Sequence, residues 1–227
     1  MIHHIQRTRC HEVGVSAAEP LLFGAAYSVY VRSVRLALAE KQVRYRLIEV
    51  DIFAPKGPPP DYLERQPFGR IPAFEHDGFR LYETGAIIRY VDEAFDGPAL
   101  QPSDPRGRAR MNQALSILDN YAYRTLVWDI YVERVDRPAK GQPADEQRIA
   151  QALRRARTCL AALEDLLAGG PWFAGADLSL ADLHAAPMLT LLRHTPEGLV
   201  LLGDYPRLGA WWAAIRDRPS MATLATT

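Results

Sequence analysis

The chain is constrained most by a change in its hydrophobic pattern near residue 96. Before that point, short apolar runs typical of strands alternate with helical stretches, whereas from residue 104 onward every periodic stretch has the helical repeat. Residues 97–105, with three prolines and one glycine, separate the two textures. The pattern predicts an extension over residues 1–20, an α/β domain over 21–96, a linker over 97–105 and an all-helical domain over 106–227.

The first domain is predicted to have the element order β-α-β-(α)-β-β-α. His76-Asp77-Gly78 lies between two apolar runs, and its Asp-Gly pair is typical of a tight hairpin turn. Thr84 is expected to cap the helix that follows. The proline-rich stretch 55–60 is expected to lack regular structure, because proline has no N–H and a restricted φ. The main elements are predicted at residues 21–23, 29–41, 44–50, 71–74, 79–82 and 84–95.

The second domain contains only helical signals. A long stretch, 106–133, has few helix breakers, and residues 146–167 place their leucines on one helical face before Gly169-Gly170-Pro171 ends the helix. Ser179 and Asp182 have the spacing of a capping box that opens another apolar helix. Residues 206–216 are the last helix predicted.

Composition excludes several classes of protein. Lys+Arg and Asp+Glu both number 27, so the formal net charge is zero, which argues against a nucleic-acid partner. The two cysteines, Cys10 and Cys159, are too few for a disulfide framework or a four-ligand zinc site. No apolar run reaches 18 residues, and the first twenty residues lack the apolar core of a secretory signal. We therefore expect a cytoplasmic protein with no membrane partner.

Most catalytic motifs are absent. The sequence has no GxxxxGK[ST], GxGxxG, GxSxG or HExxH motif and no paired CxxC, and no metal site is predicted. His184 follows the capping box, and we interpret it as a partly buried histidine with its hydrogen bonds satisfied rather than as a ligand or a base.

Three local features carry the remaining chemistry. Ser28 precedes the first helix, where free backbone N–H groups and the helix dipole favour negative charge, although an ordinary N-cap is the commoner role for such a serine. Ile71-Pro72 opens a strand and could contain a cis peptide bond. Glu83-Thr84 begins another helix, a place suited to a carboxylate ligand, or again to a simple cap. Each feature alone is weak, and their order makes the combination stronger.

This combination resembles the glutathione transferases over about residues 21–220. The similarity is carried by LLFGAAYSVYVRSVRLALAEK, LERQPFGRIPAFEHDGFRLYETGAIIRYV, AGADLSLADLHAAP and YPRLGAWWAAIRDRPS. Within the family, the first half looks most like the phi class and its bacterial relatives, which use a serine. The resemblance implies a thioredoxin-like glutathione-binding domain followed by an all-helical domain.

The resemblance also implies roles for matching residues. Ser28 takes the place of the catalytic serine, and no metal is implied. Ile71, before the family's cis-proline at Pro72, would pair its backbone with the cysteinyl part of glutathione. Glu83 and Thr84 would hold the γ-glutamyl end. Arg70 could reach the glycyl carboxylate, and Lys56 stands beside the position where a histidine–lysine pair would be expected.

The implied reaction is attack of the glutathione sulfur, held as thiolate, on a small hydrophobic electrophile. The acceptor site would lie between the domains, and an aromatic stripe at helical spacing can equally be core packing. The acceptor-site candidates are Tyr27, Tyr30, Asn120, Tyr121, Tyr123 and Trp128. The resemblance also implies a homodimer, since members of the family are usually homodimers.

Other functions fit the same resemblance. A peroxidase, lyase, dehalogenase or isomerase could use the same activated sulfur. Thiol-transferase action is disfavoured, because disulfide exchange normally needs a cysteine where Ser28 stands. A non-catalytic glutathione-binding or scaffold protein is the third reading, since a fold does not imply a function.

Overall fold

The computed structural model describes residues 19–224, so the predicted extension lies outside the described residues except for its last two positions. Four short strands form one mixed sheet in the order β2-β1-β3-β4. β1 runs parallel to β2 and antiparallel to β3, and β3 and β4 form a hairpin. The strands are β1 (Leu21–Phe23), β2 (Arg46–Ile48), β3 (Ala73–His76) and β4 (Phe79–Tyr82).

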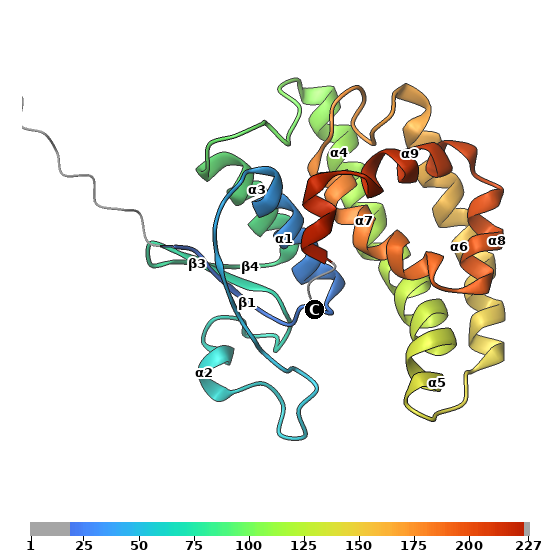
Figure 1. Ribbon diagram of the computed structural model, residues 1–227, viewed down its shortest axis with the longest axis horizontal. Helices are drawn as coiled ribbons and strands as arrows, with labels where there is room; N and C mark the ends of the chain where they lie inside the picture. Colours follow the sequence, from blue (N-terminus) through green and yellow to red (C-terminus); the bar gives the residue numbers. More distant parts are fainter. Residues whose placement is uncertain (1–18, 225–227) are drawn as a thin grey trace, which may run out of the picture.

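The predicted element order is observed. At the hairpin turn, Asp77 and Gly78 have φ values of 48° and 78°, the positive values that an Asp-Gly turn accepts. Figure 1 shows α1 (Val29–Glu40) and α3 (Thr84–Ala94) on the side of the sheet that faces the second part of the molecule. The short α2 (Pro60–Leu63) lies beyond the opposite side of the sheet.

Two local predictions are corrected. Thr84 is the first residue of α3 rather than its cap, and Glu83, with φ 70°, occupies the cap position without a side-chain capping bond. α2 begins inside the proline-rich stretch at Pro60, because a proline at the start of a helix gives up only an N–H that has no helical partner there.

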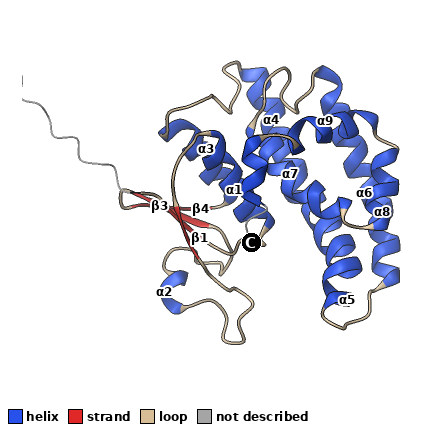
Figure 2. Cartoon of the chain, viewed as in Figure 1, coloured by secondary structure: helices blue, strands red, loops and turns tan. Residues whose placement is uncertain are grey.

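The second part contains no strand among the described residues (Figure 2). Its first helix is longer than predicted: α4 (Pro105–Ile117) continues without a break into η1 (Leu118–Asp136) and α5 (Arg137–Ala139). η1 is a π-helical segment, a hydrogen-bond pattern usually confined to single turns. The remaining elements are α6 (Glu146–Leu166), η2 (Leu167–Gly169), α7 (Leu180–Arg193), α8 (Pro196–Gly203), α9 (Pro206–Arg216) and η3 (Pro219–Leu224).

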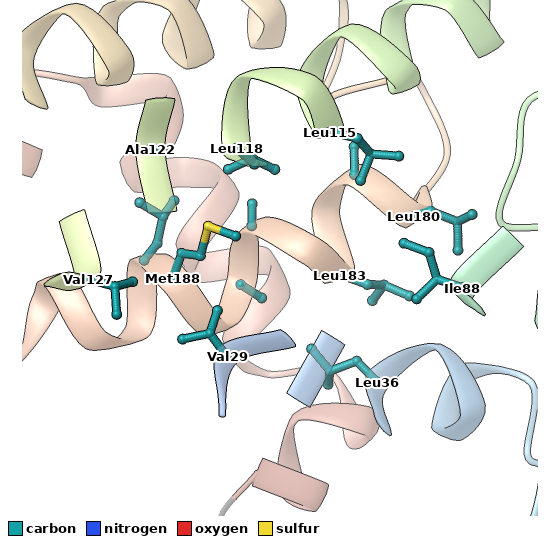
Figure 3. Packing of buried hydrophobic residues seen from close by; sticks show 14 of the residues in the cluster. Val29, Leu36, Ile88, Leu115, Leu118, Ala122, Val127, Leu180, Leu183 and Met188 are labelled. Carbon is teal, nitrogen blue, oxygen red and sulfur yellow. The ribbon is translucent and has the colours of Figure 1, made fainter. Parts of the chain in front are cut away.

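The helix α7 joins the two parts into one core. Twelve of its 14 residues are buried, so it shows no polar stripe. In Figure 3, Leu183 of α7 lies between Leu36 of α1 and Leu115 of α4, and these residues belong to a single hydrophobic cluster. The wall that α1 contributes to any site between the two parts is therefore held against the helical part by apolar packing.

The start of α7 is held by one buried carboxylate. Asp182 accepts hydrogen bonds from the backbone N–H and hydroxyl of Ser179, at 2.8 and 2.7 Å. It also accepts from the Phe173 N–H at 3.0 Å and the Trp211 Nε1–H at 2.8 Å. The capping pair predicted from sequence is present, and the same carboxylate also ties α9 to α7.

The end of the described chain returns to α1 (Figure 1). Arg218 donates two hydrogen bonds to the Glu40 carboxylate, at 2.8 and 2.7 Å, and the Ser220 hydroxyl donates a third at 2.5 Å. Burial alone would raise the pKa of Glu40, but these donors outweigh it and hold that pKa below its ordinary value. No helix within residues 19–224 is both long and apolar enough to cross a membrane.

Candidate active site

A cleft of about 1600 Å³ lies between the sheet-containing part and the helical part. One wall is built from chain segments that begin helices or strands, including Ser28, the Ile71–Pro72 pair and the Glu83–Thr84 pair. The other wall is one face of η1, which carries Asp119, Tyr123 and Trp128 into the cleft. The two walls therefore bring together residues far apart in the sequence.

Ser28 stands at the N-terminus of α1, half-buried in the first wall. Its Oγ accepts from the Val31 N–H at 3.5 Å, a long contact for a capping bond. Because the hydroxyl only accepts in this contact, its proton stays available for a ligand. The positive end of the α1 dipole adds to that donor.

Gly24 permits the close approach that shapes this wall. Its φ is +154°, and a Cβ at this position would lie 2.4 Å from Cγ2 of Val31 and 3.3 Å from Cβ of Ile71. Any larger residue would thus separate the first turn of α1 from the segment before β3. The sequence shows a glycine at the end of the first strand, but not the neighbours that require it.

The other predicted groups of the first wall reach the same cleft. The Ile71–Pro72 peptide bond is cis, and both residues are buried. Thr84 is also buried, whereas Glu83 is exposed. All four residues line the cleft.

Sequence reasoning missed the residue that holds the loop before Pro72. Gln66 is 1% exposed and lines the cleft. Its Oε1 accepts from the N–H groups of Phe68 and Arg70, at 2.7 and 3.3 Å. The Tyr62 hydroxyl donates to the Arg70 carbonyl at 2.5 Å. An amide side chain just before the Pro-Phe-Gly turn was the signal that could have revealed it, since such side chains often bond to turn backbones.

Aromatic rings face the cleft from both walls. The rings of Tyr30 and Tyr123 are 4.4 Å apart, and Phe53 lies 6.3 Å from both Tyr27 and Trp128. Burial raises the pKa of Tyr27 and of Tyr123 above the ordinary value of a phenol. Phe53 was missed, because it lies in a loop after β2 where no periodic pattern marks a side chain as inward.

Comparison with known proteins decides the family. Residues 22–99 match the glutathione S-transferase N-terminal domain family, and residues 146–214 match the glutathione S-transferase C-terminal domain family. Glutathione S-transferase F10 of Arabidopsis thaliana is 30% identical over 185 residues, which cover 81% of this chain and 86% of that protein. The chain belongs to the glutathione S-transferase family.

Further relatives of this glutathione S-transferase agree. The probable glutathione S-transferase GSTF1 of rice is 29% identical over 208 residues, covering 90% of this chain and 94% of the relative. The structure of glutathione S-transferase I from maize, in complex with an atrazine glutathione conjugate, superposes with a TM-score of 0.80 at 28% identity over 92% of this chain and 97% of that one. The predicted fold class, a thioredoxin-like domain followed by an all-α domain, is confirmed.

Three predicted site residues of this glutathione S-transferase lie outside the cleft lining. Lys56 is exposed on the loop after β2. Asn120 bonds back to the Ser116 carbonyl at 2.8 Å, and Tyr121 is 63% exposed. The lining residues of η1 recur about every four residues, so they form one face of the helix, and the two residues that directly follow Asp119 lie outside it. The lining positions of that helix are 119, 123, 124, 127, 128, 131, 132 and 136.

The prediction for His184 is wrong in one respect. The ring is fully buried, and its Nε2 lies 2.8 Å from Oδ1 of Asp119. Its Nδ1 is also buried and has no hydrogen-bond partner in the described part of the chain. The histidine is therefore only half satisfied.

The remaining reactive side chains are the cysteine thiols and the residues that could bind a metal. Within residues 19–224, no three His, Cys, Asp or Glu side chains gather as a metal site. Cys159 is buried in the helical part, where burial raises the pKa of its thiol. Cys10 lies outside the described residues.

Proposed function

We propose that this glutathione transferase holds the glutathione thiol as thiolate through Ser28 and directs it at a small hydrophobic electrophile. The supporting observation is the half-buried Ser28 hydroxyl, which lines the cleft at the N-terminus of α1. That this chain is of the serine type is our inference. The phi-class relatives reported above are plant proteins, and a bacterial source for this chain stays a prediction.

The energies are sufficient for this role. A free thiol has a pKa of about 8.5, so little of it is thiolate at neutral pH. Lowering that pKa by about two units requires about 2.7 kcal/mol of preferential thiolate stabilisation. One hydrogen bond to a charged group contributes about 1.5–3 kcal/mol. The N–H groups and dipole of a helix terminus add about 0.3–1 kcal/mol. A general base on the protein is not required.

The first wall supplies groups suited to the rest of glutathione. In our proposal, Ile71 pairs its backbone with the cysteinyl part, and Glu83 and Thr84 hold the γ-glutamyl end at the start of α3. Arg70, exposed at the cleft, takes the glycyl carboxylate. Lys56, which does not line the cleft, is left without a role.

The aromatic rings that the two walls bring together favour an apolar acceptor. Tyr27, Tyr30, Tyr123 and Trp128 offer ring faces and edges to an electrophile beside the sulfur. In the conjugation step, Ser28 donates its hydrogen bond to the sulfur while the carbon–sulfur bond forms and the leaving group departs. Peroxidase, lyase or dehalogenase activity would use the same activated sulfur, and a panel of acceptors separates these from conjugation.

The remaining expectations are proposals too. The division at residues 96–106 follows the change in pattern, and no helix or strand lies between Ala94 and Pro105. We propose a cytoplasmic homodimer, in which the first domain of one subunit meets the helical domain of the other. Sedimentation at micromolar concentration tests the assembly, and a monomer would contradict it.

The activity is tested by retention on immobilised glutathione and by conjugation of chlorodinitrobenzene. Ser28→Ala should lower kcat/KM by about 10- to 150-fold, the loss of one charge-assisted hydrogen bond. The Kd of glutathione should stay nearly unchanged, and ultraviolet difference spectra should show that the bound thiolate is lost at neutral pH. If the protein is neither retained on glutathione nor active in the assay, the proposed transferase activity is refuted. If Ser28→Ala leaves the rate unchanged, Ser28 is only the N-cap of α1.

A further inference from the structure

One carboxylate stands among the aromatic rings of the second wall. Asp119, near the start of η1, lines the cleft, and 41% of its side chain is exposed. Its Oδ1 lies 2.8 Å from Nε2 of His184, a residue of α7. The ring of Tyr30, from α1, lies 5.6 Å from the His184 ring and lines the same cleft. A buried side chain of another helix therefore holds an exposed carboxylate at this place.

The His184 ring holds the carboxylate in place. The ring is 0% exposed, and its Nδ1 has no hydrogen-bond partner within residues 19–224. The contact of Nε2 with Oδ1 of Asp119 is therefore the hydrogen bond that the ring makes in the described part of the chain. A buried ring packed on all sides has little freedom to move, so it fixes the direction in which the exposed carboxylate points into the cleft.

The charge of Asp119 acts on the aromatic side of the cleft. Burial raises the pKa of Tyr30, and the charge of Asp119 raises it further. The ring of Tyr30 lies 4.4 Å from that of Tyr123, so the carboxylate stands beside rings that would meet an aromatic acceptor.

The next cation along η1, Arg124, is paired with another carboxylate and not with Asp119. Arg124 lines the cleft, but its Nε is 3.1 Å from Oδ1 of Asp129. Asp129 in turn accepts from Arg148 and Arg155, so Arg124 is drawn into a network between η1 and α6. Within residues 19–224, Asp119 has no salt bridge to a lysine or an arginine, and its carboxylate contacts His184 instead.

We propose that Asp119 sets the charge preference of the acceptor site and that His184 is its positioning residue. This inference rests on the proposed conjugation reaction. The site should favour aromatic electrophiles that carry a positive charge or an N–H donor beside the reacting ring, and should disfavour anionic ones. An aromatic wall accepts the ring of either kind, and the fixed carboxylate discriminates between their substituents.

Three chloronitroarenes test the preference: neutral chlorodinitrobenzene, anionic chloronitrobenzoate and cationic chloronitrophenyl-trimethylammonium. In each, the sulfur forms the carbon–sulfur bond, the carbon–chlorine bond breaks and chloride leaves with its electron pair. Each kcat/KM is divided by the uncatalysed rate constant with glutathione, which removes differences in intrinsic reactivity. The ratio of the cationic to the anionic substrate then reports the field of the protein.

Asp119→Asn should lower this ratio by about a hundredfold, about tenfold from each charge, for unit charges about 8 Å apart at an effective dielectric constant of about 30. The neutral substrate is the reference, because any effect of Asp119→Asn on the sulfur itself changes all three rates alike and cancels in the ratio. Asp165→Asn makes the same charge change on an exposed part of α6 and should keep the ratio. The proposal is overturned if Asp119→Asn changes all three substrates equally, or if Asp165→Asn moves the ratio as far.

His184 is tested by a conservative pair of variants. His184→Gln retains an N–H that can reach Asp119 and should keep the ratio, whereas His184→Met removes the donor and should lower it. Equal ratios in the two variants would refute the positioning role. Should His184→Met fail to fold, Asp119→Asn still decides the charge preference. Calorimetric binding of the two charged S-aryl glutathione conjugates gives the same ratio without turnover, so a failure of conjugation stays distinguishable from a failure of this inference.

Discussion

The two walls of the cleft are built in different ways. The first wall is built where helices and strands begin: at the cap of α1 (Ser28), at the cis bond before Pro72 and at the start of α3 (Thr84). The second wall is the side of one long helix, whose side chains reach the cleft because η1 turns that face inward. The first wall offers helix starts and turn backbone beside its own rings, and the second offers only the side chains of η1, Asp119 among them.

This difference explains why one wall suits a constant ligand and the other a variable one. Helix termini and turns present N–H groups at places that the backbone dictates, so they can hold the same peptide-like molecule with little help from side chains. A helix face can exchange its side chains without changing the backbone. We therefore expect glutathione recognition to depend on the first wall and acceptor choice on the second.

The largest effect is expected at Asp182, because it holds the start of α7 and α7 packs against both walls of the cleft. Asp182→Ala should destabilise the whole chain by about 3–5 kcal/mol, because it leaves donors of Ser179, Phe173 and Trp211 buried without an acceptor. Since α7 contacts both walls, urea unfolding followed by fluorescence and by circular dichroism should give one coincident transition. Asp177→Ala, at an exposed position, is the control and should have little effect. Two separate transitions would show that the walls unfold independently.

Gly24→Ala should damage the first wall alone. The contact with Val31 and the positive φ predict a loss of about 1–3 kcal/mol in the free energy of unfolding. The Kd of glutathione should also rise, because α1 must move from the segment at Ile71. Gly78→Ala is the matched control, since its φ is +78° but a Cβ there meets nothing within 4 Å. A Gly78→Ala variant that weakens glutathione binding equally would remove the role given to close packing.

The contact of Glu40 in α1 with Arg218 and Ser220 can be tested by its pH dependence. The pKa of folded Glu40 lies below its ordinary value, so its contribution to stability is present above that ordinary value, near 4.3, and is lost as the pH falls through the folded pKa. Glu40→Gln should cost about 1–2 kcal/mol at neutral pH, since the partner Arg218 is partly exposed. The difference from wild type should shrink on acidification below pH of about 4. Glu64→Gln, at an exposed position, is the control, and a difference that is constant with pH would contradict the assignment.

The smallest effect sharpens the assignment of the second wall. Trp128→Ala should raise the KM for an aromatic electrophile by about 3- to 10-fold through lost ring contacts, while the KM for glutathione stays constant. Tyr121→Ala removes a ring from the same helix on its solvent side and should change neither constant. Equal effects of the two variants on the acceptor KM would mean that another face of η1 meets the substrate.

Local chemistry made much of the fold predictable. The Asp77-Gly78 turn needs only the tolerance of two residues for positive φ, and the capping pair Ser179 and Asp182 needs only a spacing of three. In contrast, α8 escaped prediction, since its eight residues are too few to show a helical period. The predicted order includes a helix at the place of α2, but no bounds could be given for it, because its four residues begin in a proline-rich stretch.

The site divides along the same line. Ser28, Ile71, Thr84 and their neighbours could be named because each stands at an element boundary that is visible in the sequence. Phe53 and Gln66 could not, since both lie in loops whose course no periodicity predicts. Asp119 and Asn120 are neighbours in the sequence, yet only the first lines the cleft.

The sequence alone determined the two-part architecture, the family resemblance and the wall made of helix starts and turns. Hydrophobic period, caps and turn residues act over a few residues, so they can be read along the chain. The tertiary structure alone decided which face of η1 meets the cleft, that Gly24 must stay small, and that His184 holds Asp119. These facts depend on packing between separate elements, such as the contact between Asp119 of η1 and His184 of α7, and a linear pattern carries no record of that packing.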